Sequence, residues 1–240
     1  MAHSPETPVR IRRFYKSVDI SRLDGAATIL LDGRTARTPA GRSLTLPTAA
    51  LATLIQEEWQ AQGLDIVLSN MPATRLAQTA LDGVFDHRED AVREFARFAE
   101  ADLICYFAEH PASLVKREEE SWGPLLAWAK DEFGLSFERT RGISHRRQPP
   151  AVLAAVSGIG ETAEVFDLAA LAFGAALFGS VILVLALRAG RINARETVAA
   201  ARLDEAFQEE HWGVDEEVEA HAARLMRDTV MLEKWFRALA

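Results

Sequence analysis

The sequence predicts an α+β protein in which a small β-rich N-terminal domain, residues 1–70, is followed by a larger helical bundle domain, residues 71–240. Short extended runs separated by turn residues fill the first part, and apolar residues recur at helical spacing through the second. The chain has 240 residues, of which 49% are hydrophobic, so it can bury a core large enough to support both parts.

The first 70 residues indicate a small antiparallel sheet and one helix. The run AATILLDG ends in Asp-Gly at 32–33, and this pair predicts a hairpin because both central residues of a type I′ turn need positive φ. A further turn is expected at 39–41, which reads Pro-Ala-Gly. Thr48 then begins a helix that stops at Gly63 and whose apolar face consists of Leu51, Leu54, Ile55 and Trp59.

The rest of the chain predicts helices that continue to its last residues. Asn193, with Glu196 three positions later, is a capping signature for one amphipathic helix that runs to Gly213. A terminal helix is expected from about Asp215. Apolar stripes at helical spacing predict further helices within 73–86, 89–107 and 122–134.

Residues 168–187, LAALAFGAALFGSVILVLAL, contain no charged side chain. A helix of this length, rising about 1.5 Å per residue, would match a hydrocarbon core of roughly 30 Å. The segment is alone, however, and its six alanines and two glycines lower its hydrophobicity. Asp167 before it and Arg188 with Gly190 after it suit the ends of a helix in a water-soluble protein. A buried central helix is therefore the prediction, and a membrane span is the alternative.

The composition limits the classes of partner and compartment. A net charge of −8 and a pI of 5.3 argue against a nucleic-acid binder, which needs clustered Lys and Arg. Cys105 is the only cysteine and lies in an apolar run, so a buried thiol is expected and no disulfide or cysteine-based zinc site. The N-terminal residues resemble neither a signal peptide nor an organellar presequence. The expected compartment is the cytoplasm of a bacterium, or the mitochondrial matrix of a eukaryote with no presequence visible.

No catalytic, cofactor-binding or metal-binding residue is predicted. Residues 158–163 read GxGxxA, but the region about 20 positions further on is uncharged, whereas a dinucleotide site needs an acidic residue there. An ordinary loop before a helix is the better interpretation. The chain has no GxxxxGK[ST] motif for ATP, and its histidines lack partners at a recognisable spacing.

The stretch RLDEAFQEEHWG, residues 202–213, divides into two faces on a helix. One face carries Leu203, Phe207 and Glu210 or His211. The other carries Glu205, Gln208, Glu209 and Trp212. Two interpretations stay open: either the apolar residues are core and the acids are solvated, or the face with the acids and the tryptophan contacts a partner.

Several short segments follow one another in a specific order and spacing: RFYKSVDI, LLDGRTARTPAGRSLTLPT, IQEEWQAQG, MPATRLAQTALDGV, ADLICYFAE, WGPLLAWA, GSVILVLAL and LDEAFQEEHWG. Through these segments the chain resembles a known family over nearly its whole length, namely the assembly chaperones that bind the alpha subunit of the catalytic head of ATP synthase.

This resemblance implies an ATP-independent chaperone of two domains that binds the unassembled alpha subunit until the beta subunit replaces it. It implies a partner-binding role for Glu205, and also for Gln208 and Trp212. A monomer is expected, with no cofactor, no nucleic acid and no membrane insertion. Two alternatives belong to other classes: an interaction protein anchored in a membrane by residues 168–187, and an enzyme that uses 158–163.

Overall fold

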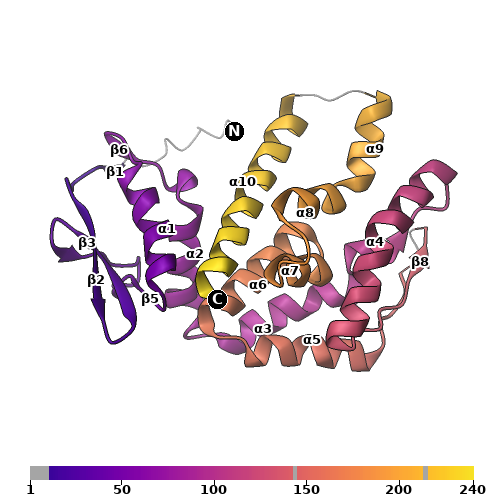
Figure 1. The fold of residues 1–240 in the computed structure, drawn as a ribbon, viewed down its shortest axis with the longest axis horizontal. Helices are drawn as coiled ribbons and strands as arrows, with labels where there is room; N and C mark the ends of the chain where they lie inside the picture. Colours follow the sequence, from indigo (N-terminus) through magenta and orange to yellow (C-terminus); the bar gives the residue numbers. More distant parts are fainter. Residues whose placement is uncertain (1–10, 143–144, 213–215) are drawn as a thin grey trace, which may run out of the picture.

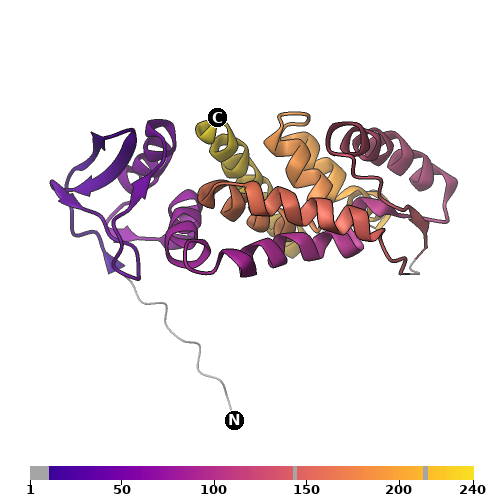
Figure 2. The same cartoon turned by 90° about the horizontal axis from the view of Figure 1, so that it is seen from below.

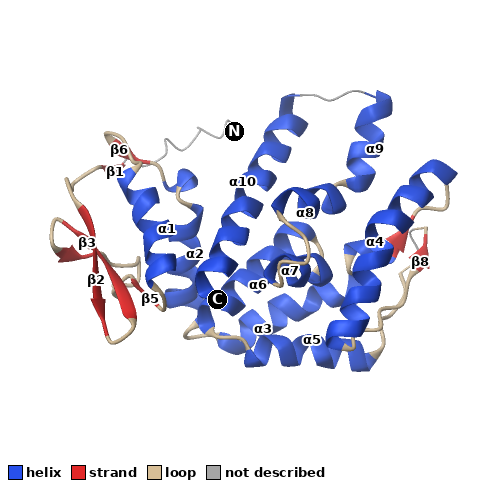
Figure 3. Ribbon diagram, viewed as in Figure 1, coloured by secondary structure: helices blue, strands red, loops and turns tan. Residues whose placement is uncertain are grey.

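The structure, a computed structural model, describes residues 11–142, 145–212 and 216–240; of residues 211 and 212 it describes the backbone alone. The molecule is elongated, with a small sheet at one end and the helices α4 (Ala112–Phe133) and α9 (Leu203–Trp212) at the other (Figure 1). In the view turned by 90°, the helices between these two ends form a shallow layer (Figure 2). The described strands gather at the N-terminal end, apart from one short parallel pair (Figure 3), which is β7 (Tyr106–Phe107) with β8 (Thr140–Arg141).

Four antiparallel strands form the N-terminal sheet, and its hairpin prediction is confirmed. Asp32 and Gly33, with φ of 49° and 76°, turn the chain from the third strand of the molecule into the fourth. Asp24 and Gly25 make the preceding turn with φ of 49° and 81°, a signal that the sequence analysis did not use. The central strand is β3 (Ala26–Leu31), which pairs with β2 (Val18–Leu23), β4 (Arg34–Thr35) and β5 (Thr45–Leu46).

The helix α1 (Ala49–Gln60) packs against β2 and β3 with the apolar face that was expected. Thr48 caps it as predicted, because its hydroxyl accepts the N–H of Leu51 at 3.1 Å. The prediction that Gly63 stops the helix is wrong. The N–H of Ala61 already bonds to the Glu57 carbonyl at 3.0 Å, and the helix ends there in right-handed geometry.

A second small sheet joins this end to the first helix of the bundle. It pairs β1 (Ile11–Arg12) with β6 (Asp65–Ile66), and a short 3-10 turn, η1 (Leu68–Asn70), leads into α2 (Pro72–Thr79). Glu58 of α1 accepts the N–H groups of Ala73 and Thr74, each at 2.7 Å, so it serves as the anion at the start of α2. Burial raises the pKa of Glu58, and these hydrogen bonds oppose that rise.

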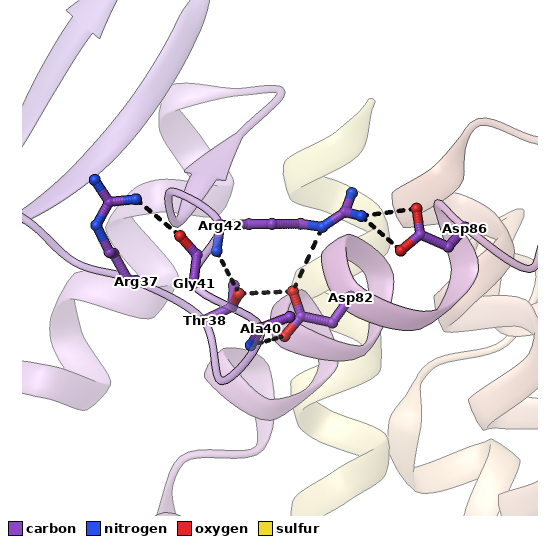
Figure 4. A network of polar contacts seen from close by, with 7 residues as sticks. All are labelled: Arg37, Thr38, Ala40, Gly41, Arg42, Asp82 and Asp86. Carbon is purple, nitrogen blue, oxygen red and sulfur yellow. Dashed lines mark hydrogen bonds and ion pairs between the residues drawn. The ribbon is translucent and has the colours of Figure 1, made fainter.

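Polar contacts also tie the turn of the N-terminal sheet to the helices (Figure 4). The turn of π-helix η2 (Ala80–Val84) carries Asp82, which accepts the hydroxyl of Thr38 at 2.6 Å and the N–H of Ala40 at 3.0 Å. Arg42 reaches further along the same segment and pairs with Asp86 at 2.5 Å. The β-rich end is therefore held on the bundle by side chains that the turn at 39–41 positions.

The remainder of the described chain is mainly helical, as predicted, and the terminal helix begins within a residue of its expected start. The further elements are α3 (Arg88–Arg97), η3 (Phe98–Ala101), η4 (Leu103–Cys105), α5 (Pro150–Thr162), α6 (Val165–Phe178), α7 (Val181–Arg188), α8 (Ala194–Ala201) and α10 (Glu216–Leu239).

The apolar segment 168–187 is buried in large part, but it is two helices rather than one. Gly179, with φ of 63°, ends α6, and Ser180 begins α7 by accepting the N–H of Leu183 at 3.0 Å. Buried Asp102 accepts the first two N–H groups of α7, those of Val181 and Ile182, at 2.7 and 3.1 Å. The chain folds back, so that Asp167 and Arg188 form an ion pair at 2.6 Å. None of the helices that the structure describes is both long and apolar enough to cross a membrane.

The single helix expected from Asn193 to Gly213 is also two helices, although its capping box at Asn193 and Glu196 is confirmed. The break falls at Arg202, which has φ of −111°. The indole N–H of Trp122 on α4 bonds to the Ala200 carbonyl at 2.9 Å and so satisfies one of the acceptors at the end of α8. A contact with a distant helix, which the local sequence does not reveal, therefore stabilises this helix end.

Residues 158–163 are not the loop that was expected, since Gly158 and Gly160 lie inside α5. Gly160 packs so closely that an added Cβ would lie 3.3 Å from the Phe95 ring on α3. The glycine thus allows two helices to approach each other. Cys105 is fully buried, as expected, and burial raises the pKa of its thiol well above the usual range.

These elements confirm the α+β class, with the small sheets first and the helices after them. The boundary at residue 70 stays a prediction, because α1 also contacts α10 directly. Thr48 illustrates the continuity, since its hydroxyl donates to the Ala238 carbonyl at 2.6 Å.

Candidate functional site: the cleft between α9 and α10

The candidate site is an open cleft of about 500 Å³ between α9 and the first turns of α10. α9 and the first turns of α10 lie away from the sheet, whereas the rest of α10 runs back toward it (Figure 1). From α9 the cleft receives Glu205 and Gln208, two of the three residues predicted to bind a partner. Its other lining residues are Arg202, Glu209, Glu217, Val218, His221 and Arg224.

Arg202 organises the carboxylates of this cleft. Its guanidinium, only 13% exposed, donates to Glu205 at 2.9 Å and also pairs with Glu209. The Glu205 side chain is 60% exposed, so most of its surface remains in contact with water. Because Glu205 lies mostly in water and Arg202 also keeps its pair with Glu209, Glu205 could exchange Arg202 for a cation of a partner at a cost of about 1 kcal/mol or less.

The opposite face of α9 rests on α4. Phe207 is buried at 6% exposure, and the guanidinium of Arg117 lies 5.3 Å from the centre of its ring. Arg117 also forms an ion pair with Glu210 at 2.7 Å. These contacts fix the rotation of α9 and turn the face with Glu205 toward the cleft.

A pair of carboxyl groups lies beneath this contact. Glu118 of α4 is fully buried and accepts the N–H of Ala108 at 2.8 Å, while its other oxygen has no hydrogen-bond donor among the described residues. Asp204 of α9 lies close enough to interact with it. Burial, together with the neighbouring charges of Asp204 and Glu119, raises the pKa of Glu118 to about 7. A protonated Glu118 would donate its proton to Asp204, whereas an ionised one would repel it.

The division of α9 into two faces is confirmed for the residues whose side chains are described. Phe207 is buried, and Glu205, Gln208 and Glu209 line one cleft together. The side chain of Trp212 lies outside the described part of the chain, so its predicted role stays a prediction. The sequence analysis missed Arg202 and the contribution of α10; Arg202 could have been found from its spacing of three residues to Glu205.

The described residues offer no group of three or more His, Cys, Asp or Glu side chains that could hold a metal ion. Charged side chains around an open cleft can complement opposite charges on another protein, so the arrangement suits a protein-binding surface.

Comparisons with known proteins agree with this class. The family model described as ATP12 chaperone protein matches residues 12–130. The mitochondrial protein atp12 of Schizosaccharomyces pombe is 25% identical over 224 residues, which are 88% of this chain and 77% of that protein. The crystal structure of Atp12 from Paracoccus denitrificans is 38% identical, with a TM-score of 0.88, and the match covers 96% of this chain and 99% of that one.

A solved aspartate-to-lysine variant of Atp12p from P. denitrificans gives the same TM-score of 0.88 at 37% identity, covering 96% of this chain and 98% of that one. The chain therefore belongs to the ATP12 family of chaperones, which take part in the assembly of ATP synthase.

Proposed function

We propose that this protein binds the unassembled alpha subunit of the catalytic head of ATP synthase and prevents its aggregation until the beta subunit replaces it. The observation that carries the proposal is the likeness to ATP12 chaperones over nearly the whole chain, combined with an open acidic cleft on α9 and α10. In this proposal the protein acts as a monomer, without ATP and without catalysis, in the compartment where the catalytic head is assembled. That compartment is the cytoplasm of a bacterium or the mitochondrial matrix.

The charges of the cleft suit this role. Besides the pair held by Arg202, exposed Glu216, Glu217 and Glu219 open α10, so the acidic field extends along its first turn. Such a field steers a basic surface of the partner and fixes its orientation, while contributing less to the final affinity. We place Glu205, Gln208 and Trp212 in this contact.

Light scattering of the isolated alpha subunit, at a temperature at which it aggregates, tests the proposal. The wild-type protein should suppress aggregation equally with and without ATP, and Glu205→Lys should suppress it less. Glu132→Lys is the matched control, because it makes the same charge change at an exposed position of α4 that does not line the cleft. Absence of suppression by the wild type would contradict the proposed function. Equal suppression by Glu205→Lys would retain the function and move the site elsewhere.

A further inference from the structure

A second cleft, here called the α6 groove, opens on the apolar helix α6. It has a volume of about 570 Å³ and lies between α2, η2, α3, α6 and α10. Ala169, Ala172, Phe173 and Ala176 of α6 form one side, and Leu76 and Val84 continue the apolar surface. A volume of this size has room for a few side chains of a bound segment.

The composition of α6 makes this open surface unusual. Asp167 is the only charged residue in the 14 residues of the helix. A helix that is apolar on all sides is normally covered on all sides, whereas a helix at the surface carries polar residues on its outer face. Ala172 and Phe173 are nevertheless half-buried and Ala176 is exposed. The sequence of α6 therefore suits a helix that a partner covers during part of the protein's working cycle.

The charges around the α6 groove indicate the chemistry of that partner. Asp90, Glu94 and Asp228 reach it, against Arg75 and the imidazole of His87, so carboxylates predominate. Within α3, Asp90 pairs with Arg93 at 2.6 Å and Glu94 pairs with Arg97 at 2.7 Å.

Asp228 of α10 differs from these two acids. It is half-buried, and no hydrogen bond or ion pair joins its carboxylate to another residue that the structure describes. Burial raises the pKa of Asp228, an effect that the more distant charges of Arg227, Arg75 and Arg224 oppose. A cation that entered the groove would give this carboxylate the direct partner it lacks.

We propose that the α6 groove binds an apolar segment of the client subunit that places a Lys or Arg side chain beside Asp228. The small side chains of Ala169, Ala172 and Ala176 let the segment approach the helix closely, and Phe173 provides a larger apolar contact. This inference rests on the proposed function, since it takes the client to be the unassembled alpha subunit.

The first test measures the affinity for the alpha subunit after a bulky cation is introduced into the groove. Ala176→Arg should raise the Kd about tenfold, because the side chain fills the groove and repels the incoming cation. Ala151→Arg is the matched control on α5, which contributes no residue to the groove, and its Kd should equal that of the wild type. Both alanines are exposed, so both variants should retain the wild-type Tm.

The second test changes the acid. Asp228→Asn should weaken binding several-fold and Asp228→Lys more strongly, with Asp131→Lys as a control at an exposed position of α4. If Asp131→Lys weakened binding as much as Asp228→Lys, that result would contradict a specific pairing with Asp228.

Cross-linking identifies the occupant directly. With the photoreactive amino acid p-benzoylphenylalanine in place of Ala176, the adduct should map to an apolar stretch of the alpha subunit that has a Lys or Arg within a few residues. The same amino acid in place of Ala151 should give no such adduct. An adduct with a second copy of the chain, or with phospholipid vesicles but not with the alpha subunit, would overturn the inference.

The two proposals fail in different ways. If the wild type neither binds the alpha subunit nor suppresses its aggregation, the proposed function is wrong and the groove inference is wrong with it. If the wild type does both and Ala176→Arg does both equally well, only the inference about the α6 groove is wrong.

Discussion

The cleft between α9 and α10 and the α6 groove differ in how their charges are arranged. In the cleft, Arg202 already pairs with two carboxylates, and most of the lining side chains are polar or charged. In the groove, the side that α6 contributes is alanine and phenylalanine, and the single acid from α10 has no direct partner among the described residues. On the two proposals above, the difference divides recognition into two tasks. The exposed charges of the cleft would guide the approach of the partner, and the apolar contacts of the groove would determine how long it stays.

The largest effect expected concerns the two faces of α6. Gly174→Val should lower the free energy of unfolding by about 3 kcal/mol, because even a Cβ at this position would lie 2.4 Å from Val184 of α7. Ala176→Val, on the open face, should change it by less than about 0.5 kcal/mol. Urea denaturation of both variants measures the two values. Similar values would mean that α6 has no open face.

The free energy of unfolding should depend on pH through Glu118, which lies at the end of the molecule that carries α9. The pKa of Glu118, raised from 4.5 to about 7, means that the folded state holds this proton more tightly than the unfolded state. Its stabilising contribution is complete below about pH 4.5 and is lost as the pH rises through about 7. Relative to Glu118→Gln, the wild type should lose about 2 kcal/mol of stability over this range.

Chemical denaturation at a series of pH values compares the two proteins. Parallel curves for wild type and Glu118→Gln would show that the contact between Glu118 and Asp204 does not depend on the proton.

The cleft and the groove should control different rate constants of binding, and a variant at either surface should change its rate constant by about a factor of ten. Glu205→Lys should slow the association with the alpha subunit, and salt should reduce the difference from wild type, because exposed charges are screened. Ala176→Arg should act mainly by accelerating dissociation. Surface plasmon resonance at two salt concentrations measures both rates. If both variants changed the same rate with the same salt dependence, the two surfaces would not have separate tasks.

The smallest effect is expected at the surface of the cleft. Glu205→Ala should change the free energy of unfolding by no more than about 0.5 kcal/mol, since Glu205 is 60% exposed and Arg202 keeps its pair with Glu209. Arg202→Ala should cost about 1 kcal/mol or more, because it leaves half-buried Glu209 without its cation. Thermal unfolding of both variants measures which substitution costs more stability. A larger loss for Glu205→Ala would indicate that this residue supports the fold rather than contacting a partner.

Features that depend on neighbours in the sequence could be predicted. The hairpin at 32–33, the cap at Thr48 and the capping box at Asn193 each need only three or four residues to form. The assignment of Glu205 and Gln208 to one face of a helix follows from the same short-range geometry.

Features that depend on distant contacts could not be predicted in this way. Trp122 donates to the end of α8 from another helix, and buried Asp102 accepts from the start of α7. Neither contact leaves a local pattern. The break at Gly179 and Ser180 did have a local signal, since glycine ends helices and serine begins them, but the uniform hydrophobicity around it favoured one long helix. The α6 groove needs five separate elements, so no single stretch of sequence could indicate it.

The break between α6 and α7 also decides what this apolar stretch forms in the folded protein. A run of twenty uncharged residues is as long as a helix that spans a bilayer. The break places the run in two helices, α6 of 14 residues and α7 of eight, each shorter than the roughly 20 residues that a spanning helix needs. Glycine and serine at the centre of the run therefore give the folded protein a hairpin of two short helices, which buries a very apolar sequence without forming one long helix.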